Sequence, residues 1–340
     1  SSRRRHTRCS RDWSSDVCSS DLTREVVDGM NTRSMALDDF KRVVDEIDLY
    51  SVTMTGLGGP LIDKTIFEKL AFLRARGIMT SMPTNGTYIR RDKMEKLAAN
   101  LPDILQMSID GATKESFEYI RVRGDFEKIV ANYRQLLQLR NEGKTRPGTK
   151  MRILCALQKR NLFDYREMFA LVRSMPKLDS FDLVPVFDYD PEGSAFSHLV
   201  PTRADVARLH ASLDEAMAAT SGEDERRFYA NWKAVSSDLL VSDGKPPDGT
   251  GHGCLIPWFN AYLDAKGRVF PCCYLSNSEH VMGNIHDTSF AEIWNGPVYR
   301  NFRRKMIADR AGLAGCRTCP RNDDNRIRQL QRLKPLLGAP

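Results

Sequence analysis

The chain has 340 residues, of which 41% are hydrophobic and 28% are charged, a composition typical of a globular protein with about two domains. No apolar run reaches the roughly 18–20 residues that cross a membrane, and no segment has the pattern of a secretory signal, so we expect a cytoplasmic protein without a membrane partner. The formal net charge of +7 comes from scattered basic residues with no nucleic-acid-binding motif, and we therefore expect no nucleic-acid partner.

Residues 1–21, with the sequence SSRRRHTRCSRDWSSDVCSSD, show neither helical nor strand periodicity and contain few apolar residues. The stretch resembles the conceptual translation of sequencing-adapter DNA. We therefore interpret it as a foreign or disordered segment and expect the native sequence to begin near Leu22. A genuine disordered tail rich in Arg and Ser is the alternative. Under both interpretations the segment adds no element to the predicted fold.

From residue 36 onward, helical and strand patterns alternate along the chain. Residues 36–47 have the apolar spacing of an amphipathic helix. The pattern predicts further helices over residues 64–76, 91–99, 125–141 and 162–174, and strands over residues 49–56, 79–86, 104–111, 150–157 and 180–187. This alternation predicts parallel strands joined by right-handed helical crossovers. One more strand is expected before the first helix, where the foreign segment stands.

Three of the predicted strands end in polar residues or glycine: Thr55-Gly56, Thr84-Asn85-Gly86 and Ser108-Ile109-Asp110-Gly111. Ligands of parallel α/β sheets bind at the carboxyl ends of the strands, so the three ends together predict one site. Each end taken alone is equally explained by ordinary turn chemistry.

Residues 242–253, with the sequence SDGKPPDGTGHG, read as a linker because they offer Gly, Pro and Asp and nothing to bury. Two helices are predicted before it, near residues 202–219 and 223–240. The second domain is expected to begin at Cys254.

Five of the eight cysteines lie after the linker. Cys316 and Cys319 form a C-x2-C pair, which can direct two thiolates to one metal or cluster from a tight turn. A hairpin turn predicted at residues 264–267 would bring Cys254 and Cys272 towards each other. Cys273 would then point to the opposite face, where we expect it to pack. The four thiolates of Cys254, Cys272, Cys316 and Cys319 suit a zinc site or an iron–sulfur cluster, and their spacing does not decide between these.

Cys254-x12-Gly267-x4-Cys272, followed by Gly283-Asn284-Ile285, Ile293-Trp294-Asn295 and the closing C-x2-C pair, resembles the SPASM domain of radical SAM enzymes in its reduced, single-cluster form. The resemblance implies a small Cys-rich domain of hairpin and helix over residues 254–322. It also implies one auxiliary 4Fe–4S cluster held by the four cysteines. Residues 323–340 would form a C-terminal helix or tail.

The first part of the chain resembles the same family in residues 55–63 (TGLGGPLID), 84–87 (TNGT) and 108–129. The resemblance implies an α/β fold, a partial (β/α)6 TIM-like barrel over residues 22–241 that lacks its first strand and binds S-adenosylmethionine. Ser108 and Asp110 would lie near the nucleoside, and Arg121 or Arg123 near the carboxylate. The full set of implied cofactor-binding residues is Thr55, Gly56, Gly58, Gly59, Pro60, Asn85, Ser108, Asp110, Arg121 and Arg123.

The sequence departs from the family pattern in two places. Gly59 stands where the G-x-G-E-P motif has Glu, which removes a carboxylate contact, and the C-x3-C-x2-C motif of the SAM-binding cluster is absent, since Cys9 and Cys18 have the wrong spacing. We therefore expect the intact protein to bind this cluster and the chain with this sequence to be inactive.

The resemblance implies an oxidoreductase or maturase that forms a 5′-deoxyadenosyl radical and takes a hydrogen atom from a peptide or small-molecule substrate. It also implies an electron donor such as flavodoxin or ferredoxin. The sequence identifies no catalytic residue. The alternatives are a zinc-stabilised binding or scaffold protein and a SAM-binding relic.

Overall fold

The computed structural model describes residues 34–55, 59–122, 124–186, 199–241, 254–276, 280–313, 315–316 and 319. Its larger part is a five-stranded parallel sheet in the order β1-β2-β3-β4-β5, so neighbours in sequence are also neighbours in space. The strands are β1 (Ser51–Thr53), β2 (Met79–Thr84), β3 (Ile104–Ser108), β4 (Lys150–Leu157) and β5 (Ser180–Pro185). The predicted parallel α/β fold is confirmed. The extra strand predicted before the first helix lies outside the described residues.

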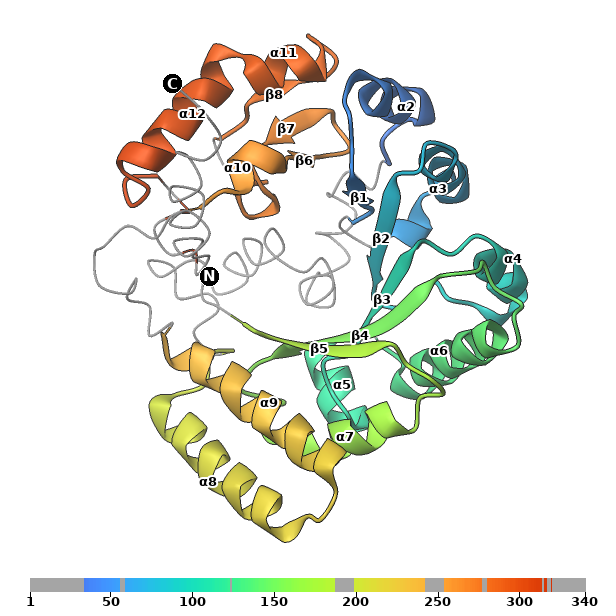
Figure 1. Cartoon of the computed structure of the whole chain (residues 1–340), viewed down its shortest axis with the longest axis vertical. Coiled ribbons are helices and arrows are strands. Elements are labelled where there is room, and N and C mark those ends of the chain that lie inside the picture. The colour runs from blue at the N-terminus through green and yellow to red at the C-terminus, as the bar shows by residue number, and fades with distance from the viewer. Residues whose placement is uncertain are drawn as a thin grey trace, which may run out of the picture.

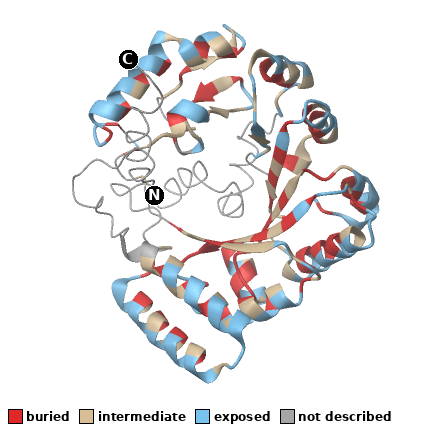
Figure 2. Ribbon diagram, viewed as in Figure 1, coloured by how far each residue is buried: buried red, intermediate tan, exposed pale blue. Residues whose placement is uncertain are grey.

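The connecting helices follow the outer side of the curved sheet (Figure 1). They are α2 (Leu37–Glu46), α3 (Ile66–Ala75), α4 (Met94–Ala99), α5 (Lys114–Ile120), α6 (Phe126–Asn141) and α7 (Tyr165–Arg173), with the 3-10 turns η2 (Pro60–Ile62) and η3 (Arg91–Lys93). Their inward faces are buried and their outward faces exposed (Figure 2). Two further helices, α8 (Arg203–Ala219) and α9 (Glu223–Val241), form a pair beside β5. No helix among the described residues combines the length and apolar character that crossing a bilayer requires.

The carboxylate of Asp103 connects the amino ends of neighbouring strands through hydrogen bonds. Asp103 Oδ2 accepts hydrogen bonds from the backbone N–H and the hydroxyl of Thr80, both at 2.7 Å, and Arg146 donates to Oδ1 at 2.5 Å. Burial alone would raise the pKa of Asp103, but the hydrogen bonds from Thr80 and Arg146 outweigh it and lower that pKa below its usual value. This end of the sheet is therefore held by polar contacts.

The C-terminal part is a small module around the antiparallel sheet β6-β7-β8. Its elements are α10 (Ile256–Phe259), β6 (Tyr262–Leu263), β7 (Arg268–Phe270), the 3-10 turn η4 (Cys273–Leu275), β8 (Gly283–Asn284), α11 (Phe290–Asn295) and α12 (Pro297–Ala308). The predicted hairpin is present: Asp264 Oδ1 accepts the N–H groups of Lys266 and Arg268 at 2.9 Å, and Gly267 has φ +77°. That left-handed conformation favours glycine, which explains the residue at this turn.

Helix α2 joins the two parts. Val43 belongs to the hydrophobic core of the C-terminal module, whereas Phe40 and Val44 pack with Leu73 and Ile78 of the sheet part. Two polar contacts reinforce this position: Arg42 Nη2 donates to the carbonyl of Ile285 at 3.0 Å, and Glu46 Oε2 accepts the N–H of Phe290 at 2.7 Å. The module is therefore attached to the sheet part through α2 as well as through the chain that follows α9 (Figure 1).

Candidate functional site

The four predicted ligand cysteines come from three places in the C-terminal module. Cys254 precedes α10, Cys272 directly follows the β7 hairpin strand, and Cys316 and Cys319 follow α12. Cys316 is buried, and Cys254 and Cys272 are half-buried against the same hydrophobic core, which includes Tyr299, Phe302 and Met306. The fold thus brings segments more than 40 residues apart onto one apolar surface.

The thiols are close enough to interact electrostatically. Burial raises the pKa of Cys316 to about 12, and the neighbouring thiols of Cys319 and Cys254 act in the same direction. Burial also raises the pKa of Cys272, with Cys273, Cys316 and Cys319 adding to the rise. Arg310 opposes the rise at Cys316 and donates a hydrogen bond to the carbonyl of Cys319 at 2.9 Å. Cys272 and Cys316 therefore hold their protons more strongly than exposed thiols do, and a bound metal centre would have to displace these protons.

The arrangement also bears on which centre the cysteines can hold. Across the described ranges, no three His, Cys, Asp or Glu side chains converge as ligands of a single metal ion. Four cysteine thiolates suit both a tetrahedral zinc ion and an iron–sulfur cluster, so the donor set alone does not decide between these two centres.

Cys273 differs from the expectation. We predicted that it would pack on the opposite face of a strand, but it is exposed. The reason is local: β7 ends at Phe270 and the chain turns into η4 at Cys273, so the alternation of a strand no longer applies. Cys272, at the N-cap of that turn, faces the core of the module instead.

At the carboxyl ends of the strands, two predicted site residues lie together. Gly59 has φ +85°, and a Cβ built there would be 3.8 Å from Oδ1 of Asn85. Gly59 and Pro60 are buried and begin η2, while Thr55 is exposed just after β1. A Glu at position 59 would have to adopt φ +85° and ψ 146°, a backbone region nearly restricted to glycine, at a cost of about 1–3 kcal/mol, so the departure from G-x-G-E-P accompanies a backbone suited to glycine. Gly56, Gly58 and Arg123 lie outside the described residues.

Asp110 and Arg121, for which the sequence suggested separate contacts to a ligand, form an ion pair with each other. Both side chains are buried: Asp110 is 1% exposed and Arg121 is 4% exposed. Ser108, two residues before Asp110, is also 1% exposed. Asp110 Oδ1 also accepts the N–H of Ala156 at 2.8 Å. The pair therefore ties the end of β3 to β4 and to the end of α5, and the sequence did not predict this pairing.

Sequence reasoning also missed two polar residues that support this end of the sheet. Asn161 is fully buried and donates to the carbonyls of Asp110 and Ala156 at 2.5 and 2.9 Å. Lys69, 2% exposed, donates to Asp63 Oδ2 at 2.6 Å and to the carbonyl of Met35 at 2.5 Å. Asp63 follows η2 directly, so Lys69 anchors the loop that begins at Gly59. The signal for Lys69 was its spacing of three residues from Ile66 and four from Leu73, which places it on the buried face of α3.

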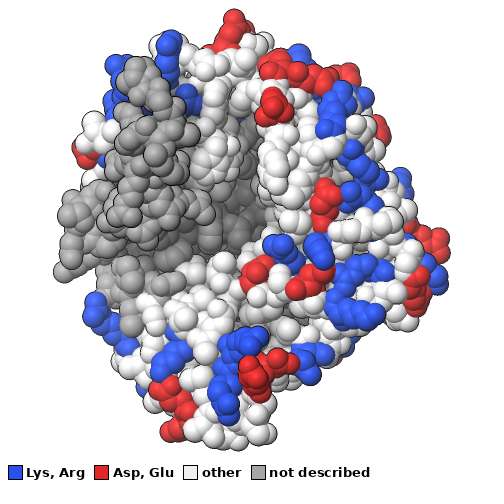
Figure 3. All heavy atoms as spheres, in the orientation of Figure 1, with Lys and Arg blue, Asp and Glu red and all other residues white. Residues whose placement is uncertain are grey.

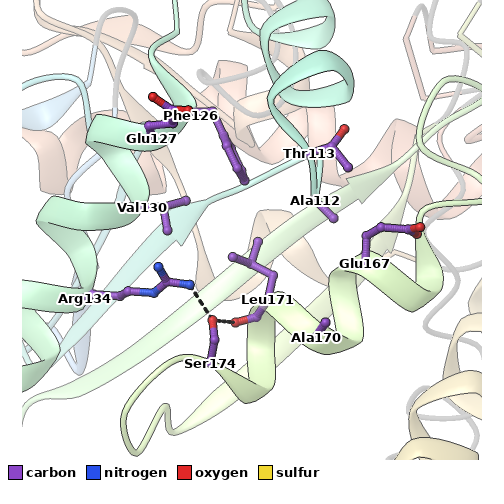
Figure 4. Close-up of a pocket in the computed structure, with 10 residues that line it drawn as sticks. All are labelled: Ala112, Thr113, Phe126, Glu127, Val130, Arg134, Glu167, Ala170, Leu171 and Ser174. Atoms are coloured by element: carbon purple, nitrogen blue, oxygen red, sulfur yellow. Dashed lines mark hydrogen bonds between the residues drawn. The ribbon is translucent and has the colours of Figure 1, made fainter.

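A cavity of about 490 Å³ lies elsewhere, on the helix side of the sheet between α6 and α7. Figure 4 shows Val130 and Leu171 pointing into it and Arg134 donating to Ser174, a hydrogen bond of 2.6 Å. None of the predicted site residues lines this cavity. We therefore place the candidate sites at the strand ends and at the cysteines.

Comparison with known families gives two matches that together span most of the described chain. The radical SAM superfamily matches residues 9–153, and the iron–sulfur cluster-binding domain SPASM matches residues 254–320. The first match begins within the segment that we interpret as foreign.

Two curated relatives are similar over most of their length. The AdoMet-dependent heme synthase of Methanosarcina barkeri is 25% identical over 302 residues, 83% of this chain and 82% of that protein. The mycofactocin maturase MftC of Mycobacterium ulcerans is 25% identical over 291 residues, 80% of this chain and 70% of that protein.

Two solved structures share the fold. Streptococcus suis SuiB bound to its precursor peptide SuiA has a TM-score of 0.54 at 16% identity, and the match covers 78% of this chain and 59% of SuiB. Native anSMEcpe with bound AdoMet has a TM-score of 0.52 at 20% identity, covering 79% of this chain and 73% of that one. The present chain thus spans about six-tenths of the length of SuiB.

Proposed function

Because the chain belongs to the radical SAM superfamily and carries a C-terminal SPASM domain, we propose that its intact form abstracts a hydrogen atom from a peptide or small-molecule substrate by means of a 5′-deoxyadenosyl radical. The cofactors of this family are S-adenosylmethionine and 4Fe–4S clusters, and the relatives named above are enzymes. The observation that supports the proposal best is the packing of Cys254, Cys272 and Cys316 against one hydrophobic core, with Cys319 hydrogen-bonded through its N–H to the carbonyl of Cys316.

We assign Cys254, Cys272, Cys316 and Cys319 as the ligands of one auxiliary 4Fe–4S cluster. Such a cluster, when bound, accepts and releases single electrons. The residues around it exclude water, since Tyr299, Phe302 and Met306 belong to the core that contacts the cysteines. Arg310 donates a hydrogen bond to the carbonyl of Cys319 and so fixes its backbone. Its positive charge also lies near Cys316, whose thiol would become an anionic thiolate when the cluster binds.

For the S-adenosylmethionine site, the strand ends supply the proposed contacts. Gly59, Pro60 and Asn85 lie together at the ends of β1 and β2, with Thr55 exposed at the same edge and Gly56, Gly58 and Arg123 proposed from sequence. Ser108 and Asp110 are proposed to shape the nucleoside part of the site, and Arg121 or Arg123 is proposed to lie near the carboxylate. The buried ion pair between Asp110 and Arg121 would act there by holding β3, β4 and α5 in a fixed relation.

The SAM-binding cluster does not fit this sequence. Its eight cysteines contain no C-x3-C-x2-C motif, so the three thiolates that the cluster needs are missing. We therefore propose that the chain with this sequence does not cleave S-adenosylmethionine, and that the native form carries the motif before Leu22.

The substrate class is supported by the relatives. One is named as a heme synthase and another as a mycofactocin maturase, and SuiB was solved with a precursor peptide. These names cover small-molecule and peptide substrates, which are the two classes that we propose here. The electron donor is proposed to be a flavodoxin or a ferredoxin.

Anaerobic purification followed by assays of iron, sulfide and zinc tests the proposal. We expect about four irons and four sulfides per chain and a broad absorbance near 400 nm. One zinc per chain in a colourless protein would support the zinc-stabilised scaffold instead. Incubation of the same protein with dithionite and S-adenosylmethionine should give no 5′-deoxyadenosine, and product formation would refute the proposed lack of cleavage.

A further inference from the structure

Helix α12 has two different faces. Its inner face carries Tyr299, Phe302 and Met306, which are buried in the core that includes Cys316 and contacts Cys272. The outer face carries three exposed cations, Arg300, Arg304 and Lys305. The helix thus lies between these cations and the core that includes Cys316, at a thickness of about one helix diameter, roughly 10 Å.

Among the described residues, the outer cations of α12 have no acidic partner, unlike several cations on other helices. Arg42 pairs with Glu46 in α2, Lys114 with Glu118 in α5, and Arg227 with Glu223 in α9. The sequence of α12, PVYRNFRRKMIA, contains no acidic residue. Asp309, one turn after Lys305, instead accepts the N–H of Gly312 at 3.0 Å. Within the described part of the chain, no carboxylate forms an ion pair with Arg300, Arg304 or Lys305.

This arrangement opposes helix stability. Arg300 and Arg304 are four residues apart, and like charges at this spacing destabilise a helix. Figure 3 shows lysine and arginine side chains over α12 at the upper left of the molecule. Two exposed apolar side chains belong to the same helix, Val298 at 53% and Ile307 at 76% exposure. Uncompensated cations mixed with exposed apolar side chains are typical of a surface that an acidic protein covers.

We propose that the outer face of α12, defined by Arg300, Arg304, Lys305 and Ile307, is the docking surface for an acidic one-electron carrier protein. The inference rests on the proposed function, because the carrier would exchange electrons with the auxiliary cluster beneath this helix. In the exchange the reduced carrier loses one electron and the oxidised cluster gains it, and no covalent bond or proton is transferred. The surface is small and basic, which suits a weak, electrostatically steered encounter.

A nucleic acid is the other polyanion that a basic helix can attract. The exposed apolar side chains and the small number of cations favour a protein partner, because nucleic-acid interfaces are more strongly charged. We therefore include duplex DNA and transfer RNA as competing ligands in the test.

The test uses the whole chain after anaerobic reconstitution of its cluster, with an acidic flavodoxin as the probe. We expect binding that weakens when the salt concentration rises from about 20 mM to about 200 mM. The variant Arg300→Glu/Arg304→Glu/Lys305→Glu should weaken binding about tenfold or more, mainly through a slower association rate. A milder variant, Arg304→Gln/Lys305→Gln, removes two charges without reversing them. It should weaken flavodoxin binding to an intermediate extent, so the inference can still be tested if the triple variant does not fold.

The matched control is Arg91→Glu/Lys93→Glu/Lys128→Glu, which makes the same change in net charge at exposed residues of η3 and α6. It should leave flavodoxin affinity within about twofold of that of the unmodified chain. Equal weakening by both triple variants, salt-independent binding, or tighter binding of DNA or transfer RNA would overturn the inference. Iron content is measured on every sample, so a chain that holds no iron refutes the proposed function, whereas a loaded chain that does not bind flavodoxin refutes only the docking surface.

Discussion

The ammonium group of Lys69 lies 2.6 Å from Oδ2 of Asp63, and the two side chains are only 2% and 14% exposed. Burial alone would raise the pKa of Asp63, but hydrogen bonds from Lys69 and Thr65 outweigh it and lower that pKa. The carboxylate of Asp63 therefore stays ionised at neutral pH. The pair ties the loop after Gly59 to α3 and, through the carbonyl of Met35, to the segment before α2.

Replacing Lys69 by Met should destabilise the protein by about 3–5 kcal/mol, because the buried carboxylate of Asp63 would lose its cation. Urea unfolding of the purified chain measures the change. The exposed pair Arg90–Asp92 provides the control: Arg90→Met should cost less than about 1 kcal/mol. A Lys69→Met variant as stable as this control would show that the loop does not depend on the buried pair.

Replacing Arg121 by Met should also cost about 3–5 kcal/mol, since Asp110 would remain as a buried charge without its partner. Adding Asp110→Asn to this variant should recover part of the loss, because the double variant buries no charge. A double-mutant cycle by chemical denaturation gives the coupling energy. Purely additive effects would mean that the two side chains act independently.

Gly111 lies where β3 meets α5, and a Cβ built there would be 2.4 Å from the backbone nitrogen of Phe117. Gly111→Ala should therefore cost about 3 kcal/mol or more, since backbone must move. Gly143→Ala is the comparison: it has φ +72° with nothing within 4 Å of its Cβ, so only the backbone conformation opposes it, by about 1–2 kcal/mol. The reverse order in thermal unfolding would contradict the close approach of α5 to the strand end.

Cys272 and Cys273 are neighbours that should respond differently to replacement. Cys272→Ala should lose most of the bound iron and the absorbance near 400 nm, because it removes a proposed ligand. Cys273→Ala should keep about four irons per chain, because its side chain is exposed away from the core of the module. Iron analysis of both variants after the same reconstitution decides the assignment, and iron loss in the Cys273 variant alone would reverse it.

The lowered pKa of Asp103 predicts that the stability of the folded protein depends on pH. Its pKa is lowered in the folded protein, so its contribution is fully present above the unfolded pKa of about 3.9 and is lost as the pH falls through the folded pKa. Asp103→Asn should cost about 1–3 kcal/mol at pH 7, and this difference should shrink below about pH 4. Urea unfolding at several pH values measures it; a difference that stays constant at low pH would exclude the ionised carboxylate as its source.

The alternation of strands and helices was predictable where an element has a clear apolar period, as α2 and α7 do. Residues 36–47, for example, were expected as a helix and form α2 over Leu37–Glu46. The short helix α5 was missed, since seven residues show little periodicity, although Thr113 and Ser116 form a capping box at its start. The helices α11 and α12 were likewise recognised in the sequence only as family motifs.

The candidate sites were predictable where they depend on spacing. The C-x2-C pair and the hairpin at Asp264 predicted one site for Cys254, Cys272, Cys316 and Cys319. In the structure Cys254, Cys272 and Cys316 pack on one core, and the assignment of all four as ligands stays a prediction. The pairing of Asp110 with Arg121 could not be predicted, because it depends on how α5 turns back towards β3 and β4. Cys273 shows the same limit: one residue decides where a strand ends, and the direction of its side chain follows.

The contacts of α2 have a practical consequence for protein engineering. Residues 242–253 look like the natural point at which to exchange C-terminal modules among relatives, but such a chimera would inherit Arg42, Val43 and Glu46 from the wrong parent. These side chains match the backbone near Ile285 and Phe290 and the core of this module. A transplanted C-terminal module should therefore be transferred together with its own version of α2, which lies about 200 residues before the linker.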